Sequence, residues 1–142
     1  MATPVPRFLT MKGRVLDASL WLLQFILFAA FTSAAWMKIM TPIPKLAAIW
    51  PWAGELPEPI VRMLGVIDLA GGVGVFLPML TRIKPQLTAP AALGCVVLQI
   101  CAMIFHISRG EIAATPVNVV FVAIASVILW GRRHLRAHFA SV

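Results

Sequence analysis

Four long apolar runs, separated by short polar or proline-rich segments, divide the chain. The runs cover approximately residues 18–38, 59–80, 88–107 and 112–131. A transmembrane helix needs about 20 consecutive, mostly apolar residues, so each run is long enough to cross a bilayer. The pattern predicts an all-α fold, a multi-pass integral membrane four-helix bundle with short loops that forms one transmembrane domain over residues 1–142.

The first run is too long for the apolar region of a signal peptide, so we interpret it as a retained span. Asp17, Gln24, Phe31 and Lys38 recur every seven residues and therefore lie along one face of this helix. Polar side chains inside a membrane span are costly when they face lipid. The polar stripe is therefore expected to face the other helices.

The second run carries an aspartate and several glycines in its interior. Gly65, Asp68 and Gly72 lie at positions i, i+3 and i+7 and share one face, whereas Ala70 and Gly74 form a pair of small residues on another. Small residues let neighbouring helices in a membrane approach closely. We therefore predict that Gly65, Gly72 and Gly74 are helix-packing positions and that Asp68 lies where other helices come nearest.

Residues 39–58, between the first two runs, are rich in proline and contain Trp50 and Trp52. The prolines exclude a regular helix across the whole segment, although residues 45–50 could form a short one. Tryptophan favours the headgroup level of a bilayer. The segment is either an interfacial loop lying on the membrane or a lid over a site at the same surface.

Composition and charge agree with a membrane protein and indicate its orientation. Hydrophobic residues make up 61% of the chain and charged residues 12%, about half the charged share of a typical soluble domain. One side holds eight basic residues and the other three: Arg7, Lys12, Arg14, Arg82, Lys84, Arg132, Arg133 and Arg136 against Lys38, Lys45 and Arg109. The positive-inside rule then predicts an inner (cytoplasmic) membrane protein with both termini in the cytoplasm.

The net charge of +7 is explained by attraction to anionic lipid headgroups, so the lipid bilayer is the expected partner. No nucleic-acid-binding motif accompanies the charge, and no nucleic acid partner is expected. Cys95 and Cys101 point in different directions on one predicted helix, so no disulfide between them is expected. No metal-type spacing and no haem, flavin or iron–sulfur ligand set is present, so neither a metal nor a covalently bound cofactor is expected.

With this topology, polar residues from all four spans gather at the outer end of the bundle. They form a candidate ligand-binding or polar cluster of Lys38, Arg62, Asp68, His106 and Asn118. We expect Asp68 to be ionised and to be paired with Lys38, His106 or Asn118 on a neighbouring helix. The cluster either fixes helix register alone or forms a pocket for a small amphipathic molecule. No catalytic residue is identified, and whether the protein is an enzyme stays open.

These residues lie in motifs that resemble those of the DoxX-like family of small bacterial four-helix membrane proteins. The matching segments are Ala-Ala-Trp-Met-Lys ending at Lys38, residues 62–72 followed by Leu-Pro at Pro78, Phe105-His106, and Arg-Gly-Glu followed by Asn118. Together these motifs span nearly the whole chain. The family usually carries a glutamate where Asp68 stands.

The resemblance implies a link to membrane redox systems, since relatives are associated with quinone-reducing thiosulfate oxidation, methylamine utilisation and thiol or superoxide defence. Our first hypothesis is an accessory subunit of a membrane redox system, with partner redox proteins, that binds a quinone-like or other lipophilic molecule at the outer-side cluster. The alternative is a non-catalytic assembly factor or scaffold for partner membrane proteins. A third is a small transporter working as a homo-oligomer, because four spans rarely enclose a path alone.

Overall fold

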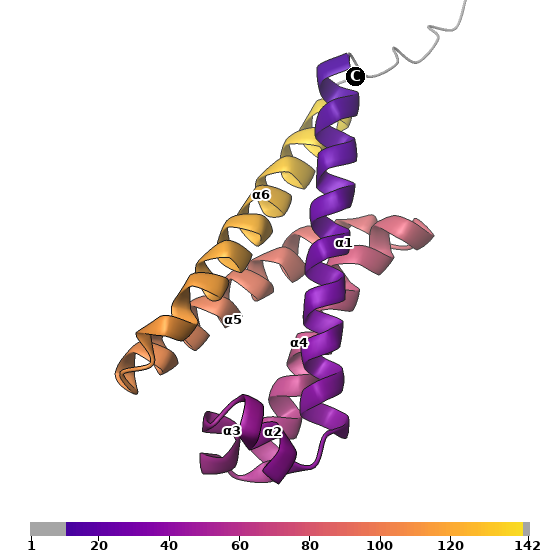
Figure 1. The fold of residues 1–142 in the computed structure, drawn as a ribbon. Coiled ribbons are helices and arrows are strands. Elements are labelled where there is room, and N and C mark those ends of the chain that lie inside the picture. Colours follow the sequence, from indigo (N-terminus) through magenta and orange to yellow (C-terminus); the bar gives the residue numbers. More distant parts are fainter. Residues whose placement is uncertain (1–10, 141–142) are drawn as a thin grey trace, which may run out of the picture.

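The computed structural model describes the backbone of residues 11–140 and the side chains of residue 11 and residues 13–135 (Figure 1). Its long helices are α1 (Met11–Met40), α4 (Glu58–Thr81), α5 (Thr88–Ser108) and α6 (Thr115–Ala140). Two short helices, α2 (Ile43–Ile49) and α3 (Trp52–Glu55), lie between α1 and α4. The 3-10 turns η1 (Pro85–Leu87) and η2 (Ile112–Ala114) precede α5 and α6.

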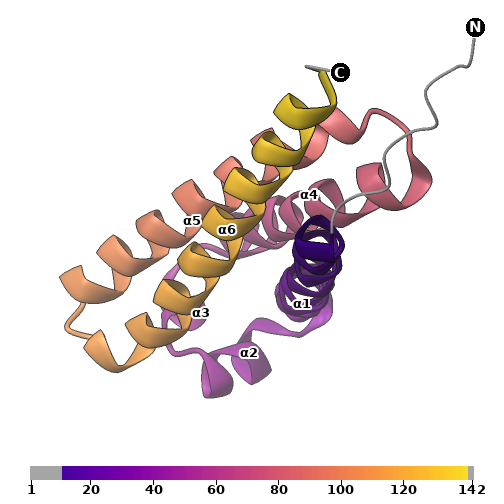
Figure 2. The same ribbon diagram turned by 90° about the horizontal axis from the view of Figure 1, so that it is seen from above.

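The long helices form two antiparallel pairs. Helix α1 packs along α4, and α5 packs along α6, as Figure 2 shows for the second pair. The pairs meet where α4 contacts α5 and where α1 contacts α6, which closes the bundle. Helices α2 and α3 lie together at the end where α1 finishes and α4 begins (Figure 1).

The structure confirms the all-α fold and the four membrane-spanning helices. The stretches that are long and apolar enough to cross a bilayer are Gly13–Met40, Glu58–Thr81, Pro85–Ser108 and Ile112–Leu135. The short helix expected at residues 45–50 corresponds to α2. The fourth helix is longer than the predicted run, which ended at residue 131, because α6 continues as a regular helix to Ala140. Three of the counted basic side chains, Arg7, Lys12 and Arg136, lie outside the described side chains.

A small apolar core runs through the centre of the bundle. Leu27, Phe31, Val75, Ala125 and Ile128 are buried there, and Phe31 meets Phe121 edge to face. Many large apolar side chains instead point outward on all four long helices. Because lipid tails are as apolar as these side chains, the helices are held together by close packing and polar contacts rather than by hydrophobic burial.

The predicted glycine positions lie where helices touch. A Cβ atom on Gly65 would come within 2.9 Å of the Cβ of Lys38, and one on Gly72 within 3.1 Å of the Cβ of Phe31. Gly74 makes an equally close approach to α5. Two glycines therefore bring α4 against α1 and a third brings it against α5, so the polar stripe of α1 faces the middle of the bundle.

Adding one methyl group at Gly65 is expected to push α1 away from α4. Gly65→Ala should destabilise the protein by about 1–3 kcal/mol, the usual cost of overpacking a filled interior. Gly94→Ala is the matched control, because a Cβ at Gly94 meets nothing within 4 Å. Thermal unfolding in mild detergent compares the two variants. Equal midpoints would contradict the close approach of the two helices at Gly65.

Candidate functional site

An ion pair between α1 and α4 lies at the centre of the candidate site. Lys38 Nζ donates to Asp68 Oδ2 at 2.5 Å, and the two side chains are only 15% and 7% exposed. Lys38 is the last polar residue of the heptad stripe, and Asp68 shares its face with the two glycines that bring α1 close. Because a lone charge inside a membrane span is costly, each side chain supplies the partner that the other needs.

Two tryptophans lie over the lysine of this pair. The rings of Trp50 and Trp52 stack on each other with centroids 6.2 Å apart. Lys38 Nζ lies 5.6 Å from the first ring centroid and 5.7 Å from the second, within cation–π range. The ammonium group therefore lies between one carboxylate and two aromatic faces.

The segment that carries these tryptophans is packed onto the bundle. Leu46, Ala53 and Val61 are fully buried in a small core of their own, with both tryptophans against it. The rings therefore lie over the Lys38 side of the ion pair and are held there by this core. Of the two interpretations of residues 39–58, this geometry favours the lid.

A second group of charges ties α3 to the turn between α5 and η2. Arg109 donates to both carboxylate oxygens of Glu55, at 2.7 and 2.8 Å, and also contacts Glu111 at 2.9 Å. His106 Nδ1 lies 2.7 Å from the same Glu111 carboxylate. Hydrogen bonds from Arg109 hold the pKa of Glu55 below its usual range, and those from Arg109 and then His106 do the same for the pKa of Glu111. Both carboxylates are therefore ionised at neutral pH.

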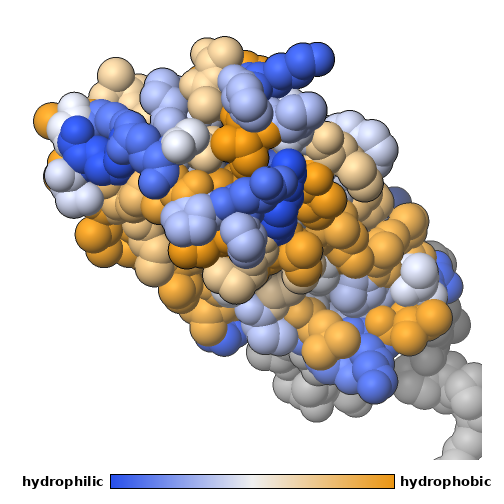
Figure 3. Space-filling model, turned by 90° about the horizontal axis from the view of Figure 1, so that it is seen from below, coloured by the Kyte–Doolittle hydropathy of each residue, from blue (hydrophilic) through white to orange (hydrophobic). Residues whose placement is uncertain are grey.

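Aromatic contacts connect the two charged groups. Trp52 meets Phe105 edge to face with centroids 6.2 Å apart, and Phe105 in turn contacts the ring of His106 at 5.6 Å. The guanidinium of Arg109 lies 5.3 Å from the Phe105 centroid. Seen from below, this end of the molecule shows hydrophilic residues grouped among hydrophobic ones (Figure 3).

The other predicted members of the cluster have different partners. Arg62 donates to the backbone carbonyls of Lys38 and Thr41, at 2.5 and 2.8 Å, and pairs with Glu58. It thereby satisfies carbonyl groups at the end of α1, which have no partner within their own helix. Arg62 therefore holds the end of α1 and the start of the α2–α3 segment in place.

His106 and Asn118 were also considered as partners for Asp68, and neither has this role. His106 is paired with Glu111. Asn118 is 6% exposed in α6, and the described residues include no hydrogen-bond partner for its side chain. Of the five predicted residues, the structure brings Lys38 and Asp68 into direct contact, with Arg62 on the backbone beside them.

Sequence analysis missed a buried polar network at the opposite end of the bundle. Arg132 was counted among the eight basic residues of one side of the membrane, but it is only 5% exposed. Its guanidinium pairs with Asp17 at 2.6 Å, donates to Gln24 Oε1 and lies 5.3 Å from the Trp21 ring. Gln24, itself fully buried, donates to the carbonyl of Val75. The sequence signal for this network was the polar stripe of α1, because its Asp17 and Gln24 side chains need a polar partner from another helix.

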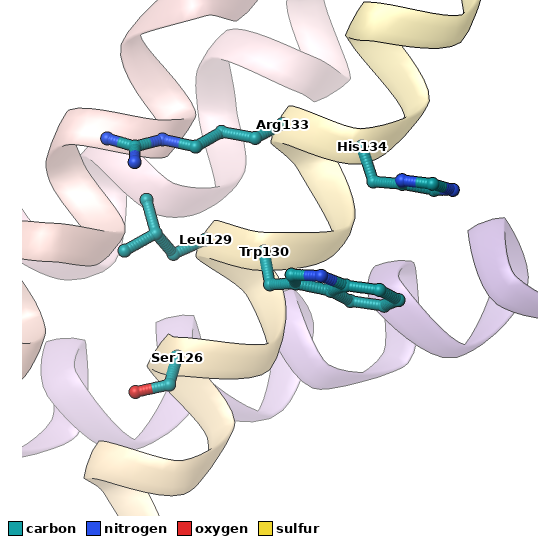
Figure 4. Close-up of a pocket in the computed structure, with 5 residues that line it drawn as sticks. All are labelled: Ser126, Leu129, Trp130, Arg133 and His134. Carbon is teal, nitrogen blue, oxygen red and sulfur yellow. The ribbon is translucent and has the colours of Figure 1, made fainter.

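The described residues include no group of three or more histidine, cysteine or acidic side chains that could hold a metal ion. Cys95, which is buried, and Cys101, which is exposed, are both free thiols. An open hollow of about 430 Å³ lies on α6 toward its C-terminal end, where the rings of Trp130 and His134 stack (Figure 4). Its lining residues belong to one helix, so it is a surface depression and lies apart from the ion pair.

Four apolar helices that enclose a buried ion pair define a multi-pass membrane four-helix bundle. The chain matches the model of the DoxX-like family over residues 22–128, and it therefore belongs to this family. The match contains Lys38, Asp68 and the other three residues of the predicted cluster. No curated protein and no solved structure matches the chain.

Breaking either side of the ion pair should leave a buried charge uncompensated. Asp68→Asn and Lys38→Met are each expected to destabilise the protein by about 3–5 kcal/mol. The double variant should lose less than the sum of the two, since neither charge is then left alone. Thermal stability in detergent is measured for the wild type, both single variants and the double variant.

Lys45→Met is the matched control, because Lys45 is an exposed lysine of α2. It should leave the unfolding midpoint almost unchanged. Strictly additive losses in the cycle would mean that the two charges do not stabilise each other in the membrane protein.

Proposed function

We propose that the protein is an accessory subunit of a membrane redox system that binds a quinone-like or other lipophilic small molecule at the Lys38–Asp68 pair. The observation that carries the proposal is the Lys38 ammonium group lying between a carboxylate and the faces of Trp50 and Trp52. An ammonium group donates hydrogen bonds to carbonyl oxygens, and indole rings stack on flat conjugated rings. A planar molecule with carbonyl oxygens suits both features.

Membership of the DoxX-like family supports the redox setting, through the associations that the resemblance implies. In this proposal the protein holds the molecule close to the membrane surface, and a partner redox protein exchanges electrons with it. The α2–α3 segment, latched by Arg109 to Glu55, shields the bound ring from water.

We further propose that the protein lies in the inner membrane with both termini in the cytoplasm. At the lid end, Arg62 pairs with Glu58 and Arg109 with Glu55, whereas Lys45 is exposed. At the other end, the loop between α4 and α5 carries Arg82 and Lys84, both exposed. Lysine and arginine in short loops are favoured on the cytoplasmic side, and the count made from the sequence gives this end the larger number.

Reporter fusions test this orientation. A green fluorescent reporter fused after Val142 should be fluorescent and alkaline phosphatase at the same place inactive, because both report a cytoplasmic end. A truncated fusion after Gly54, in the lid, should give the opposite result. Active phosphatase after Val142 would reverse the proposed orientation.

Binding at the ion pair is tested with a benzoquinone that carries a decyl chain, titrated by calorimetry into the protein in mild detergent. Loss of a hydrogen bond from a charged group costs about 1.5–3 kcal/mol. Lys38→Met should therefore weaken binding by about 10- to 100-fold, measured below its unfolding midpoint. Lys45→Met should bind like the wild type. No binding to the wild type, or equal affinity for Lys38→Met, would overturn the proposal.

A further inference from the structure

A hollow of about 260 Å³ opens between α4 and α5, within their membrane-spanning parts. We call it the α4–α5 groove. The residues that matter for the argument are Ile67, Ala70 and Gly71 on α4, and Gly94, Cys95 and Leu98 on α5. Its walls are small or apolar, and Ile67, Ala70 and Gly94 are exposed on the outside of the bundle. The groove therefore opens sideways, toward the lipid.

The groove exists because two glycines lack side chains there. A Cβ atom on Gly71 would come within 3.0 Å of the Cys95 sulfur, whereas one on Gly94 would meet nothing within 4 Å. Gly71 thus lets α5 come close enough to form the floor. Gly94 leaves the open notch above that floor, which a larger side chain could fill without disturbing the protein.

One end of the groove lies beside Asp68 on α4. Helices α4 and α5 run in opposite directions and touch at Gly74 and Ala91, where a Cβ on the glycine would lie 2.9 Å from the alanine Cβ. This contact closes the groove at the end away from the lid. The other end begins at Ile67, the chain neighbour of Asp68, and the lining residue Gly71 lies one helical turn from Asp68 on α4.

The aqueous route to the same pair is covered. Trp50 and Trp52 lie over Lys38, and Arg109 fastens the lid segment through Glu55. A molecule that reaches the pair without opening the lid must therefore come from the membrane side. The α4–α5 groove offers that side an apolar path next to Asp68.

We propose that the α4–α5 groove holds the hydrocarbon chain of a lipophilic molecule whose polar head lies at the Lys38–Asp68 pair. The inference rests on the proposed function of that pair and adds the chemical class of its ligand, a head with one long apolar chain that enters from the bilayer. A helix from a second copy fits less well. A helix with side chains is about 10–12 Å wide, whereas α4 and α5 already touch at one end of the groove.

Filling the notch at Gly94 should remove the space for the hydrocarbon chain and leave the site for the polar head, at the Lys38–Asp68 pair, intact. Gly94→Leu adds a side chain into the open space, and Val97→Leu is the control, because Val97 is exposed on the same helix but does not line the groove. The probes are a benzoquinone with a decyl chain and the same ring with a methyl group in its place. Calorimetry in mild detergent gives the affinity of each protein for each probe.

The decyl probe should bind Gly94→Leu about tenfold or more weakly than the wild type, because burial of about two methylene groups is lost. Val97→Leu should match the wild type, and the methyl probe should bind all three proteins equally. Equal affinities of all three proteins for the decyl probe would overturn the assignment of the groove to the hydrocarbon chain. The proposed head site at the ion pair would be unaffected. No binding of either probe to the wild type would overturn the proposed function and this inference together.

Light scattering of the same samples tests the other possible occupant of the groove, a helix from a second copy of the chain. A smaller particle for Gly94→Leu than for Val97→Leu, with unchanged decyl affinity, would assign the groove to a second copy of the chain and overturn the proposal. An unchanged particle size together with the weakened decyl affinity supports it.

Discussion

The contact between Lys38 and Asp68 is the constraint on which the lid half of the bundle depends. It requires α1 and α4 to approach closely at Gly65, because this glycine packs against Lys38 itself. It also fixes the end of α1, where Arg62 donates hydrogen bonds to the carbonyl oxygens of Lys38 and Thr41. The chain then turns at once into the α2–α3 segment, whose tryptophans can reach the ammonium group only because α1 ends there.

The two helix pairs are joined by polar groups at both ends. At one end Arg132 of α6 inserts between Asp17 and Gln24 of α1. At the other, Arg109 beyond α5 binds Glu55 of the lid. Since apolar contacts between helices gain little in lipid, such directional contacts account for the unique register of the two pairs. Along the sides of the bundle, including the contact of α4 with α5, small residues determine how closely the helices approach.

The sequence was sufficient to predict the four helices, because length and hydropathy decide which segments can cross a bilayer. It was also sufficient for the heptad stripe and the glycine face of α4, and from these for Lys38 as one of three candidate partners of Asp68, beside His106 and Asn118. It could not assign His106 to Glu111 or Arg132 to Gln24. Those pairings depend on where a helix ends and how far a long side chain reaches. The spacing of residues along the sequence gives no information about either.

The position of the ion pair relative to water and lipid decides what kind of molecule can use it. The lid gives Lys38 aromatic faces and screens it from the aqueous side, and the same screening strengthens any hydrogen bond that its ammonium group donates. The glycines of α4 and α5 leave the lipid side accessible beside Asp68. In the function that we propose, a site screened by the lid, accessible from the lipid side and furnished with one charged donor selects for a molecule with a compact polar head and an apolar body.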